Sequence, residues 1–361
     1  MGGLTTRGVP PKHNVMEVTL VGPGYGECIL LHIGNGSWVI VDSCIGADSR
    51  PAALAYLHDM GLDPPEVVHL IVATHWHDDH IRGMGELVEV CGDATFCCAS
   101  ALRTQEFLTM MDAIASRPMS QVGSGMQELY KVRSFLEKRP AKPVFAIANR
   151  KIFSRDSCEI WSLSPFDEEV DSFLREIDRL RPQERKTKRR TPTLTPNKTA
   201  VVLLIKIDDT AILLGSDLEG RGWLDILAAY EGSNCKASVF KVPHHGSQNA
   251  HEDRVWSEML HSEPIAALTP WKKGGRSLPT KSDVKRILSF TRKAYATAPF
   301  DISSSKPARR RNRTVEKTIR EASKRISHVA PSPGMIRLRR RFGSQLYWDI
   351  ETFAPACQLM D

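Results

Sequence analysis

The sequence has no long hydrophobic run and no C-x-x-C pair. Even its longest apolar stretches are short, for example residues 201–205, whereas a membrane-spanning helix needs roughly 20 consecutive apolar residues. The first residues lack the apolar core of a secretory signal. The eight cysteines are scattered, which excludes a zinc ribbon and a thioredoxin-type motif. These absences predict a cytoplasmic protein without a membrane segment, whose cysteines are reduced and mostly buried.

Positive charge is concentrated in two segments. The 361 residues carry a net charge of +7. Residues 306–341 contain thirteen Lys and Arg and two Glu, and residues 181–190 contain six basic residues and one Glu. Such segments attract polyanions, although a solvated face or a dock for a protein has the same composition. The candidate nucleic-acid contacts are Arg189, Arg190, Arg309, Arg310 and Arg311.

The order of expected strands and helices predicts an α/β fold with two sheets covered by helices, an αβ/βα sandwich. Strands are expected over residues 16–20, 28–33, 38–41, 67–73, 144–147, 159–163, 200–207, 211–214, 238–242 and 265–269, with a closing hairpin from 335–338 and 346–350. Helices are expected over 51–61, 167–181, 315–326 and 282–293, the last with Ser282 as N-cap, and two more lie within 101–139.

The strongest chemical signal follows the strand expected at 67–73. His75 and His77 are two residues apart, so on an extended strand end they project from the same face and can bind one metal ion. Asp79 and His80 lie beyond the turn and can reach a second ion. Imidazole and carboxylate ligands suit zinc, manganese or iron.

Two further polar clusters follow strands. Asp217 comes after the apolar run 211–214, where a carboxylate can bridge two ions about 3.5–4 Å apart. His244 and His245 follow the strand at 238–242 and project differently, so one is expected to bind metal and the other to face substrate or a supporting group. His244 comes first after the strand and is favoured as the ligand. Asp79 and His245 are the candidate catalytic residues.

These residues together resemble the metallo-β-lactamase superfamily. The residues that match its motifs are His75, His77, Asp79 and His80 for H-x-H-x-D-H, Asp217 for the bridging Asp, and Asp42 for an early Asp that supports the metal loop. The segments VGPGYGECILLHIGNGSWVIVDS, LLGSDLEG and KVPHHGS are similar to the metallohydrolase domain of ComEC-type competence proteins and its soluble relatives. The resemblance covers residues 14–100, 197–300 and 334–357, and implies a four-layer αβ/βα sandwich with two divalent ions, Zn²⁺ or Mn²⁺.

One departure from the superfamily concerns the first ion. Most members carry a third histidine for it between the H-x-H-x-D-H motif and the bridging Asp, but no histidine lies between His80 and His244. The ComEC-type branch also lacks this residue. Fewer nitrogen ligands make zinc less assured and favour manganese.

The predicted function is a metal-dependent phosphodiesterase or nuclease that acts on DNA through a metal-activated water. The resemblance and the basic segments favour phosphodiesters. The alternatives are a small-molecule metallohydrolase, for a nucleotide phosphodiester, lactone or thioester, and a subunit of a bacterial defence complex with a protein partner. The chain is predicted to form one domain over residues 1–361, with a helical insertion at about 101–140, a basic loop at about 181–198 and a basic C-terminal segment at about 306–341.

Overall fold

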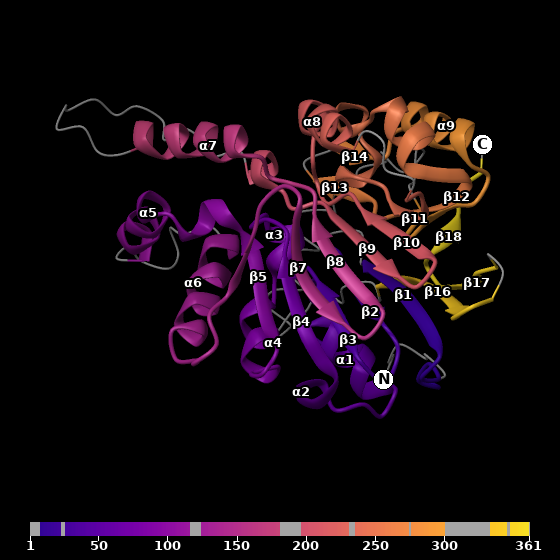
Figure 1. Ribbon diagram of the computed structural model, residues 1–361, viewed down its shortest axis with the longest axis horizontal. Coiled ribbons are helices and arrows are strands. Elements are labelled where there is room, and N and C mark those ends of the chain that lie inside the picture. Colours follow the sequence, from indigo (N-terminus) through magenta and orange to yellow (C-terminus); the bar gives the residue numbers. More distant parts are fainter. Residues whose placement is uncertain are drawn as a thin grey trace, which may run out of the picture.

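Two eight-stranded sheets face each other in the computed structural model (Figure 1). The structure describes residues 8–22, 26–115, 124–180, 196–230, 235–273, 276–299, 333–344 and 347–360. The first sheet has the order β17-β16-β1-β2-β3-β4-β5-β6, with bounds Asp349–Phe353, Gly334–Arg341, Val15–Gly22, Cys28–His32, Trp38–Val41, Val68–Ala73, Thr95–Ala99 and Val144–Ala146.

The second sheet has the order β18-β15-β12-β11-β10-β9-β8-β7. Its strands span Cys357–Gln358, Ala294–Ala296, Leu260–Leu268, Ala237–Lys241, Thr210–Leu214, Leu203–Ile207, Cys158–Ser162 and Arg150–Arg155. A small hairpin, β13 (Trp271–Lys273) with β14 (Arg276–Leu278), stands apart from both sheets.

Helices cover the outer faces of the sheets, which gives the four layers of the predicted sandwich. The helices are α1 (Ala52–Asp59), α2 (Pro64–Val67), α3 (Asp78–Ile81), α4 (Met84–Val90), α5 (Gln105–Ala115), α6 (Ser124–Leu136), α7 (Asp167–Leu180), α8 (Gly220–Tyr230) and α9 (Lys281–Phe290). Short single turns span Ser100–Arg103, Pro196–Thr199, His244–Gly246, Gln248–Ala250 and Val255–Met259. In Figure 1, α1, α2 and α4 lie at the first sheet, and α8 and α9 lie at the second.

Strand periodicity separates the two hydrophobic cores. Along β9, Leu203 and Ile205 belong to the core between the sheets, whereas Leu204 packs on the opposite side with Trp223 of α8 and Ile287 of α9. Successive side chains of a strand point to opposite faces. A strand in the middle of a four-layer structure must therefore be apolar on both faces, as residues 201–205 are.

Parallel pairing brings several strand ends to one edge. In the first sheet β3 pairs parallel with β4, and in the second β10, β11 and β12 are parallel neighbours. Ligand sites in α/β folds form beyond the carboxyl ends of such strands. The residues that follow these strands are the polar clusters at 42, 74–80, 216–217, 244–245 and 269.

The sandwich and most of the expected strands are confirmed, but the start of α9 differs from the prediction. Thr280, not Ser282, is its N-cap. The Thr280 side chain accepts a hydrogen bond from the backbone N–H of Asp283, and the Asp283 carboxylate accepts one from the Thr280 N–H. This reciprocal capping box satisfies two end donors, which a lone Ser282 cannot do.

The basic segment predicted at 306–341 also needs a correction. Its last eight residues form β16, which lies between β17 and β1. Three arginines of this strand form ion pairs: Arg337 with Glu351, Arg339 with Glu17, and Arg340 with Asp209. These side chains are part of the fold and are not available to a polyanion.

Other predictions fall outside the described residues. These are the helix at 315–326 and the five candidate nucleic-acid contacts, Arg189, Arg190, Arg309, Arg310 and Arg311. Within the described ranges, none of the helices has the length and apolar character needed to span a bilayer.

Candidate metal centre

A first group of potential ligands joins the two sheets. His75 and His77 follow β4, and their rings meet edge to face with centroids 5.0 Å apart. Asp217 follows β10 of the other sheet, and its Oδ2 lies 3.7 Å from Nε2 of His75. One ligand atom from each of these three residues lies within 4.8 Å of the others. That spacing allows all three to bind one ion.

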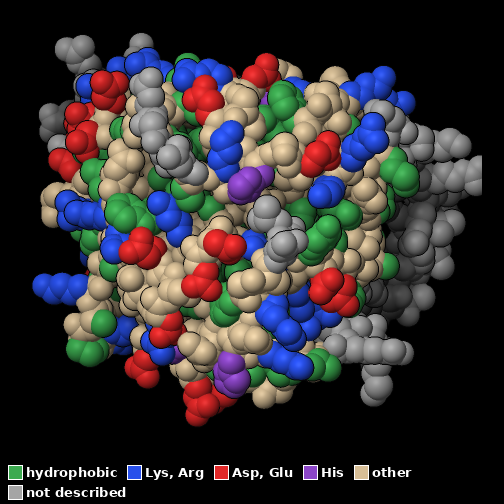
Figure 2. Space-filling view, turned by 45° about the vertical axis from the view of Figure 1, so that its right-hand side comes forward, with side chains coloured by type: hydrophobic (Ala, Val, Ile, Leu, Met, Phe, Trp, Pro, Cys, Tyr) green, Lys and Arg blue, Asp and Glu red, His purple; other side chains and the backbone are tan. Residues whose placement is uncertain are grey.

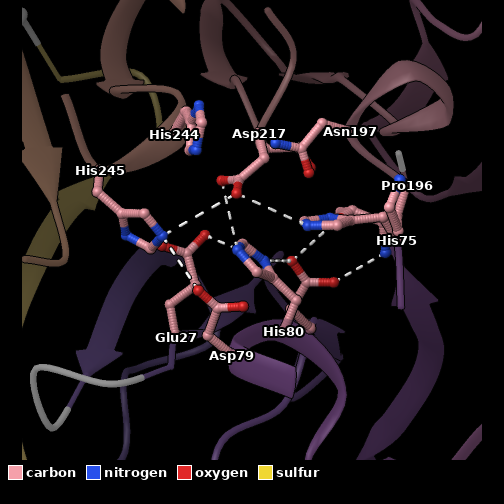
Figure 3. A network of polar contacts seen from close by, with 12 residues as sticks. Glu27, His75, Asp79, His80, Pro196, Asn197, Asp217, His244 and His245 are labelled. Atoms are coloured by element: carbon pink, nitrogen blue, oxygen red, sulfur yellow. Dashed lines mark hydrogen bonds and ion pairs between the residues drawn. The ribbon is translucent and has the colours of Figure 1, made fainter. Parts of the chain in front are cut away.

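A second group lies beside the first. It consists of Asp79 and His80 from α3 and His245 from the turn after β11. Nε2 of His245 is 3.2 Å from Oδ2 of Asp79, and Nε2 of His80 is 3.3 Å from Oδ1 of Asp217. Figure 3 shows Asp217 between the two groups. A shared carboxylate between two ligand sets is the arrangement of a two-ion site.

Hydrogen bonds at the back of three imidazoles, those of His75, His80 and His245, hold each ring with its Nε2 toward the centre. The Nδ1 atom of His80 donates to Asp42 at 2.7 Å, and that of His245 donates to the backbone oxygen of Thr269 at 2.8 Å. Nδ1 of His75 lies 3.0 Å from the Thr74 hydroxyl. A fixed Nδ1–H leaves Nε2 as the lone-pair nitrogen that binds metal.

Asp42 lies behind the centre, where the sequence analysis expected a supporting residue. Its carboxylate accepts hydrogen bonds from the backbone N–H and the hydroxyl of Thr74, each at 2.8 Å, and from His80. Asp42 therefore connects the end of β3 to the start of the H-x-H-x-D-H loop. This arrangement orients His80 and fixes its tautomer.

A buried ion pair lies beneath the same ligands. Nζ of Lys241, on β11, is 2.5 Å from Oε1 of Glu27 and 3.9 Å from Oδ1 of Asp217. Both Lys241 and Glu27 are about fully buried, with 2% and 1% exposure. Lys241 also donates to the backbone oxygen of Ser216 at 3.0 Å. The pair thus holds the strand end that carries Asp217.

The centre is electrostatically suited to cations. Its buried charges are four carboxylates, Glu27, Asp42, Asp79 and Asp217, against the single ammonium of Lys241, a formal charge of −3 with neutral imidazoles. Nε2 of His75 and of His80 and Oδ1 of Asp217 are buried without hydrogen-bond partners. Buried charges and polar atoms need partners. Divalent ions fit both requirements.

The pKa shifts reflect the same charge imbalance. Burial disfavours the imidazolium of His80, but the carboxylates of Asp217 and Glu27 outweigh burial and hold the pKa of His80 well above its ordinary value. The pKa of His245 is raised in the same way, against burial, by Asp217 and Asp79. For Asp79, burial is outweighed by the hydrogen bond from His245, so its pKa is lowered. Metal binding at this group therefore competes with protons.

The two adjacent histidines have different surroundings. His245 is buried and belongs to the second ligand group. His244, which the sequence analysis favoured as the ligand, belongs to neither group; its Nδ1 is 3.5 Å from Oε1 of Glu219, and its side chain is one-fifth exposed. His244 lines the cavity above the centre instead.

A cavity of about 920 Å³ opens onto the centre. Its walls include Trp76, Met126, Trp271 of β13 and Arg276 of β14, and its floor includes Asp217. The ring of Trp271 stacks near that of His245, with centroids 6.3 Å apart and planes 25° apart. Among the described residues that line this cavity, Arg276 is the single Lys or Arg.

Comparison with known proteins identifies the family. The model of the metallo-beta-lactamase superfamily matches residues 21–255, more than half of the chain. The chain belongs to the metallo-beta-lactamase superfamily. Members of this superfamily are generally hydrolytic enzymes that bind divalent metals, usually zinc. No curated protein sequence matches the chain significantly.

Solved structures of the superfamily resemble the chain at low identity. Rm3 metallo-beta-lactamase is 14% identical over 68% of this chain and 82% of its own, with a TM-score of 0.36. YhfI from Bacillus subtilis, a metallo-beta-lactamase fold protein, is 14% identical over 63% and 70%, with a TM-score of 0.33. A metallo-beta-lactamase from Cronobacter sakazakii is 14% identical over 62% and 73%, with a TM-score of 0.35.

Sequence reasoning missed several residues of this superfamily member's centre. The missed residues are Glu27, Thr74, Lys241, Trp271 and Arg276. A signal existed for Lys241, because it is a charged residue within an otherwise apolar buried strand. The hairpin that carries Trp271 and Arg276 has no periodicity long enough to predict it.

Proposed function

We propose that this member of the superfamily is a metal-dependent phosphodiesterase that cleaves DNA. The observation that carries the proposal is the pair of neighbouring ligand groups at the floor of the cavity, with Asp217 of the first group 3.3 Å from His80 of the second. His75, His77 and Asp217 would hold one ion, and Asp79, His80 and His245 would hold the other. The ions would be Zn²⁺ or Mn²⁺.

The metals, when bound, would lower the pKa of a water and offset the negative charge that develops in the transition state. The chain's own residues position the reaction. Asp42 and Thr269 orient the imidazoles of His80 and His245, and the buried Lys241 stabilises the carboxylate of Asp217. His244 and Arg276 line the cavity, where His244 can exchange a proton with substrate and Arg276 can pair with a phosphate.

The distribution of charge supports a polyanionic substrate. Residues 181–190 and 306–325 carry net charges of +5 and +7, so the rest of the chain is net −5. On the face shown in Figure 2, basic and acidic side chains of the described residues are interspersed. The net positive charge of the chain therefore comes from these two segments. Basic segments of this kind bind phosphate backbones without sequence preference. The ComEC-like motifs favour the same substrate.

A second candidate is a small-molecule phosphodiesterase. The observation in its favour is the cavity itself, because about 920 Å³ with one arginine and two tryptophans suits a single nucleotide-sized ligand. In that case the basic segments would serve another purpose, such as docking a protein of a defence complex.

The test is cleavage of single- and double-stranded DNA by purified protein loaded with Zn²⁺ or Mn²⁺, with metal content measured in parallel. Asp79→Ala should abolish cleavage and lower metal content, because it removes a ligand and an acceptor of His245. Asp93→Ala, at an exposed position, is the matched control and should behave like the wild type.

His244→Ala refines the test. It should retain metal and lose turnover, since His244 lies outside both ligand groups. Full metal-dependent activity of Asp79→Ala would contradict the site assignment. Hydrolysis of small phosphodiesters without cleavage of DNA would replace the nuclease proposal with the second candidate.

A further inference from the structure

The first ligand group has three protein donors, which leaves a fourth position for a water or another side chain. It offers two imidazoles and one shared carboxylate, His75, His77 and Asp217. Protein sites for zinc and similar ions commonly present four ligands, or three and a water. The third histidine that most superfamily members carry has no counterpart here, because no histidine lies between residues 80 and 244.

A different polar side chain faces this group. Asn197 lies in the single turn Pro196–Thr199, just before β9. The backbone N–H of Val201 donates to the backbone oxygen of Thr74 at 3.1 Å, so this segment runs directly beside the residue that precedes His75. Asn197 and His77 line a common cavity. Figure 3 shows the amide of Asn197 directed toward Asp217 and His75.

The oxygen atom of that amide is the part left without a partner. Nδ2 of Asn197 donates to Oε1 of Glu219 at 3.1 Å, whereas Oδ1 of Asn197 is buried and makes no hydrogen bond. An ionised carboxylate can only accept, so Glu219 requires the NH₂ end of the amide and turns the oxygen the other way. The turn does not use Oδ1 either, because the N–H of Ala200 bonds to the backbone oxygen of Asn197.

Other buried atoms without a hydrogen-bond partner belong to the residues of this ligand group. They are Nε2 of His75 and Oδ1 of Asp217. Each is a lone-pair donor, and buried polar atoms in folded proteins rarely lack a partner. Carbonyl-type oxygens are regular ligands of hard divalent ions.

We propose that Oδ1 of Asn197 is a ligand of the ion held by His75, His77 and Asp217, in the place that the third histidine takes in most of the superfamily. This inference rests on the proposed two-ion site. The first ion would then have two nitrogen and two oxygen ligands from the protein. Such a set favours Mn²⁺ over Zn²⁺ more than a three-histidine set does.

The experiment measures metal binding without substrate. Chelator-treated wild-type protein, Asn197→Ala, Asn197→His and the control Asn249→Ala are titrated with Zn²⁺ and Mn²⁺ by calorimetry, and stoichiometry is checked by elemental analysis. Asn249 lines the same cavity as Asn197 but is exposed. Co²⁺ absorption spectra report the ligand set directly.

The expected results differ between the variants. Asn197→Ala should weaken one of two binding events by at least about 10-fold, the lower end of the effect of losing a supporting residue, and leave the other unchanged. Asn197→His should raise the preference for Zn²⁺ over Mn²⁺ and change the Co²⁺ spectrum, because an imidazole replaces the amide. Asn249→Ala should bind both ions like the wild type.

Two outcomes would overturn the proposal. One is Asn197→Ala binding both ions with wild-type affinity. The other is Asn197→His leaving the metal preference and the Co²⁺ spectrum unchanged while the protein stays folded. These outcomes are separate from a failure of the proposed function, because a wild-type protein that binds two ions but cleaves no DNA would refute the nuclease and leave the ligand assignment standing.

Discussion

Four residues at the metal centre hold a left-handed backbone conformation although none is glycine. Asp42, Ser216, His244 and His245 have φ values of 60°, 47°, 45° and 55°. Such a conformation costs about 1–2 kcal/mol for a residue with a Cβ atom. It persists where surrounding contacts determine it, which is typical of functional sites. Here Ser216 accepts from the N–H of His244 at 3.0 Å, which fixes the ends of β10 and β11 together.

A histidine away from the centre should make stability depend on pH. Both ring nitrogens of buried His32 are used in its neutral form: Nδ1 donates to the backbone oxygen of Val15 at 2.6 Å, and Nε2 accepts from the N–H of Gly36 at 3.1 Å. Burial lowers the pKa of His32 below 6.5. Below about pH 6.5 the unfolded chain therefore binds a proton that the folded chain does not.

The contribution of His32 to the free energy of unfolding should therefore be fully present above pH 6.5. It should be lost as the pH falls toward the pKa of His32 in the folded protein, at no more than about 1.4 kcal/mol per pH unit. Thermal unfolding between pH 7.5 and pH 5 measures it. His32→Gln should be less stable at pH 7.5 but less sensitive to acid, and His58→Gln, at an exposed site, should follow the wild type. Equal acid sensitivity of His32→Gln and the wild type would contradict this account.

At the scale of elements, β16 shows why a run of arginines need not face a polyanion. The strand lies inside the first sheet, with Arg337, Arg339 and Arg341 on one face and Arg340 on the other. Arg337 reaches the exposed Glu351 of β17, whereas Arg340 is fully buried and reaches the turn between β9 and β10 in the second sheet. Arg340 also donates to the Thr210 hydroxyl and, at 2.9 Å, to the backbone oxygen of Ser344. It therefore connects the two sheets.

The ion pair between Arg340 and Asp209 predicts that substitutions of the two adjacent aspartates, Asp208 and Asp209, affect stability differently. Asp209→Asn should lower the free energy of unfolding by about 1 kcal/mol, because it leaves the buried guanidinium of Arg340 without a counter-charge. A fully buried pair would cost about 3–5 kcal/mol, but the Asp209 side chain is 63% exposed and solvent screens its charge. Asp208→Asn, at the preceding exposed position, should change it by less than about 0.5 kcal/mol. Urea unfolding of both variants is the measurement. Equal effects would mean that Arg340 does not depend on Asp209.

At the scale of the whole molecule, charge and site are separated along the chain. The buried centre is net negative, the basic segments 181–190 and 306–325 carry the positive charge, and the rest of the chain is net −5. Under the proposed function, the segments would attract the phosphate backbone of a nucleic acid and the centre would cleave it.

The salt dependence of DNA binding tests that separation. Each phosphate contact adds roughly −0.9 to the slope of log affinity against log salt on duplex DNA and roughly −0.7 on single strands. Neutralising Arg309, Arg310 and Arg311 together should flatten the slope by about two to three units. Hydrolysis of a small chromogenic phosphodiester should be nearly unchanged, because that substrate meets only the centre.

The matched control for the salt experiment neutralises three scattered exposed lysines, Lys12, Lys142 and Lys285. It changes the net charge by the same amount but removes no segment charge, so its slope should stay close to that of the wild type. If the arginine variant and this control behave alike, the basic segment does not contact the nucleic-acid backbone.

Local patterns in the sequence were enough to predict the sandwich and five of the six residues of the two ligand groups; for the sixth, they favoured His244 over His245 as the ligand. Strand periodicity and the spacing of His75, His77, Asp79 and His80 are local properties, so a single pass along the chain reveals them. The polar residues that follow the expected strands do lie at one edge of the sheets, because parallel neighbouring strands have their carboxyl ends at the same edge.

Residues that are neighbours in the sequence take different roles once the chain is folded. His244 and His245 are adjacent, yet the left-handed turn buries one with Asp79 and turns the other to the cavity. Arg340 and the basic residues before it look alike in sequence, but pairing within the sheet buries Arg340. Glu27, Lys241 and Asn197 come from three distant segments. Their importance arises from buried charge and unpartnered atoms, which exist only once the sheets have packed together.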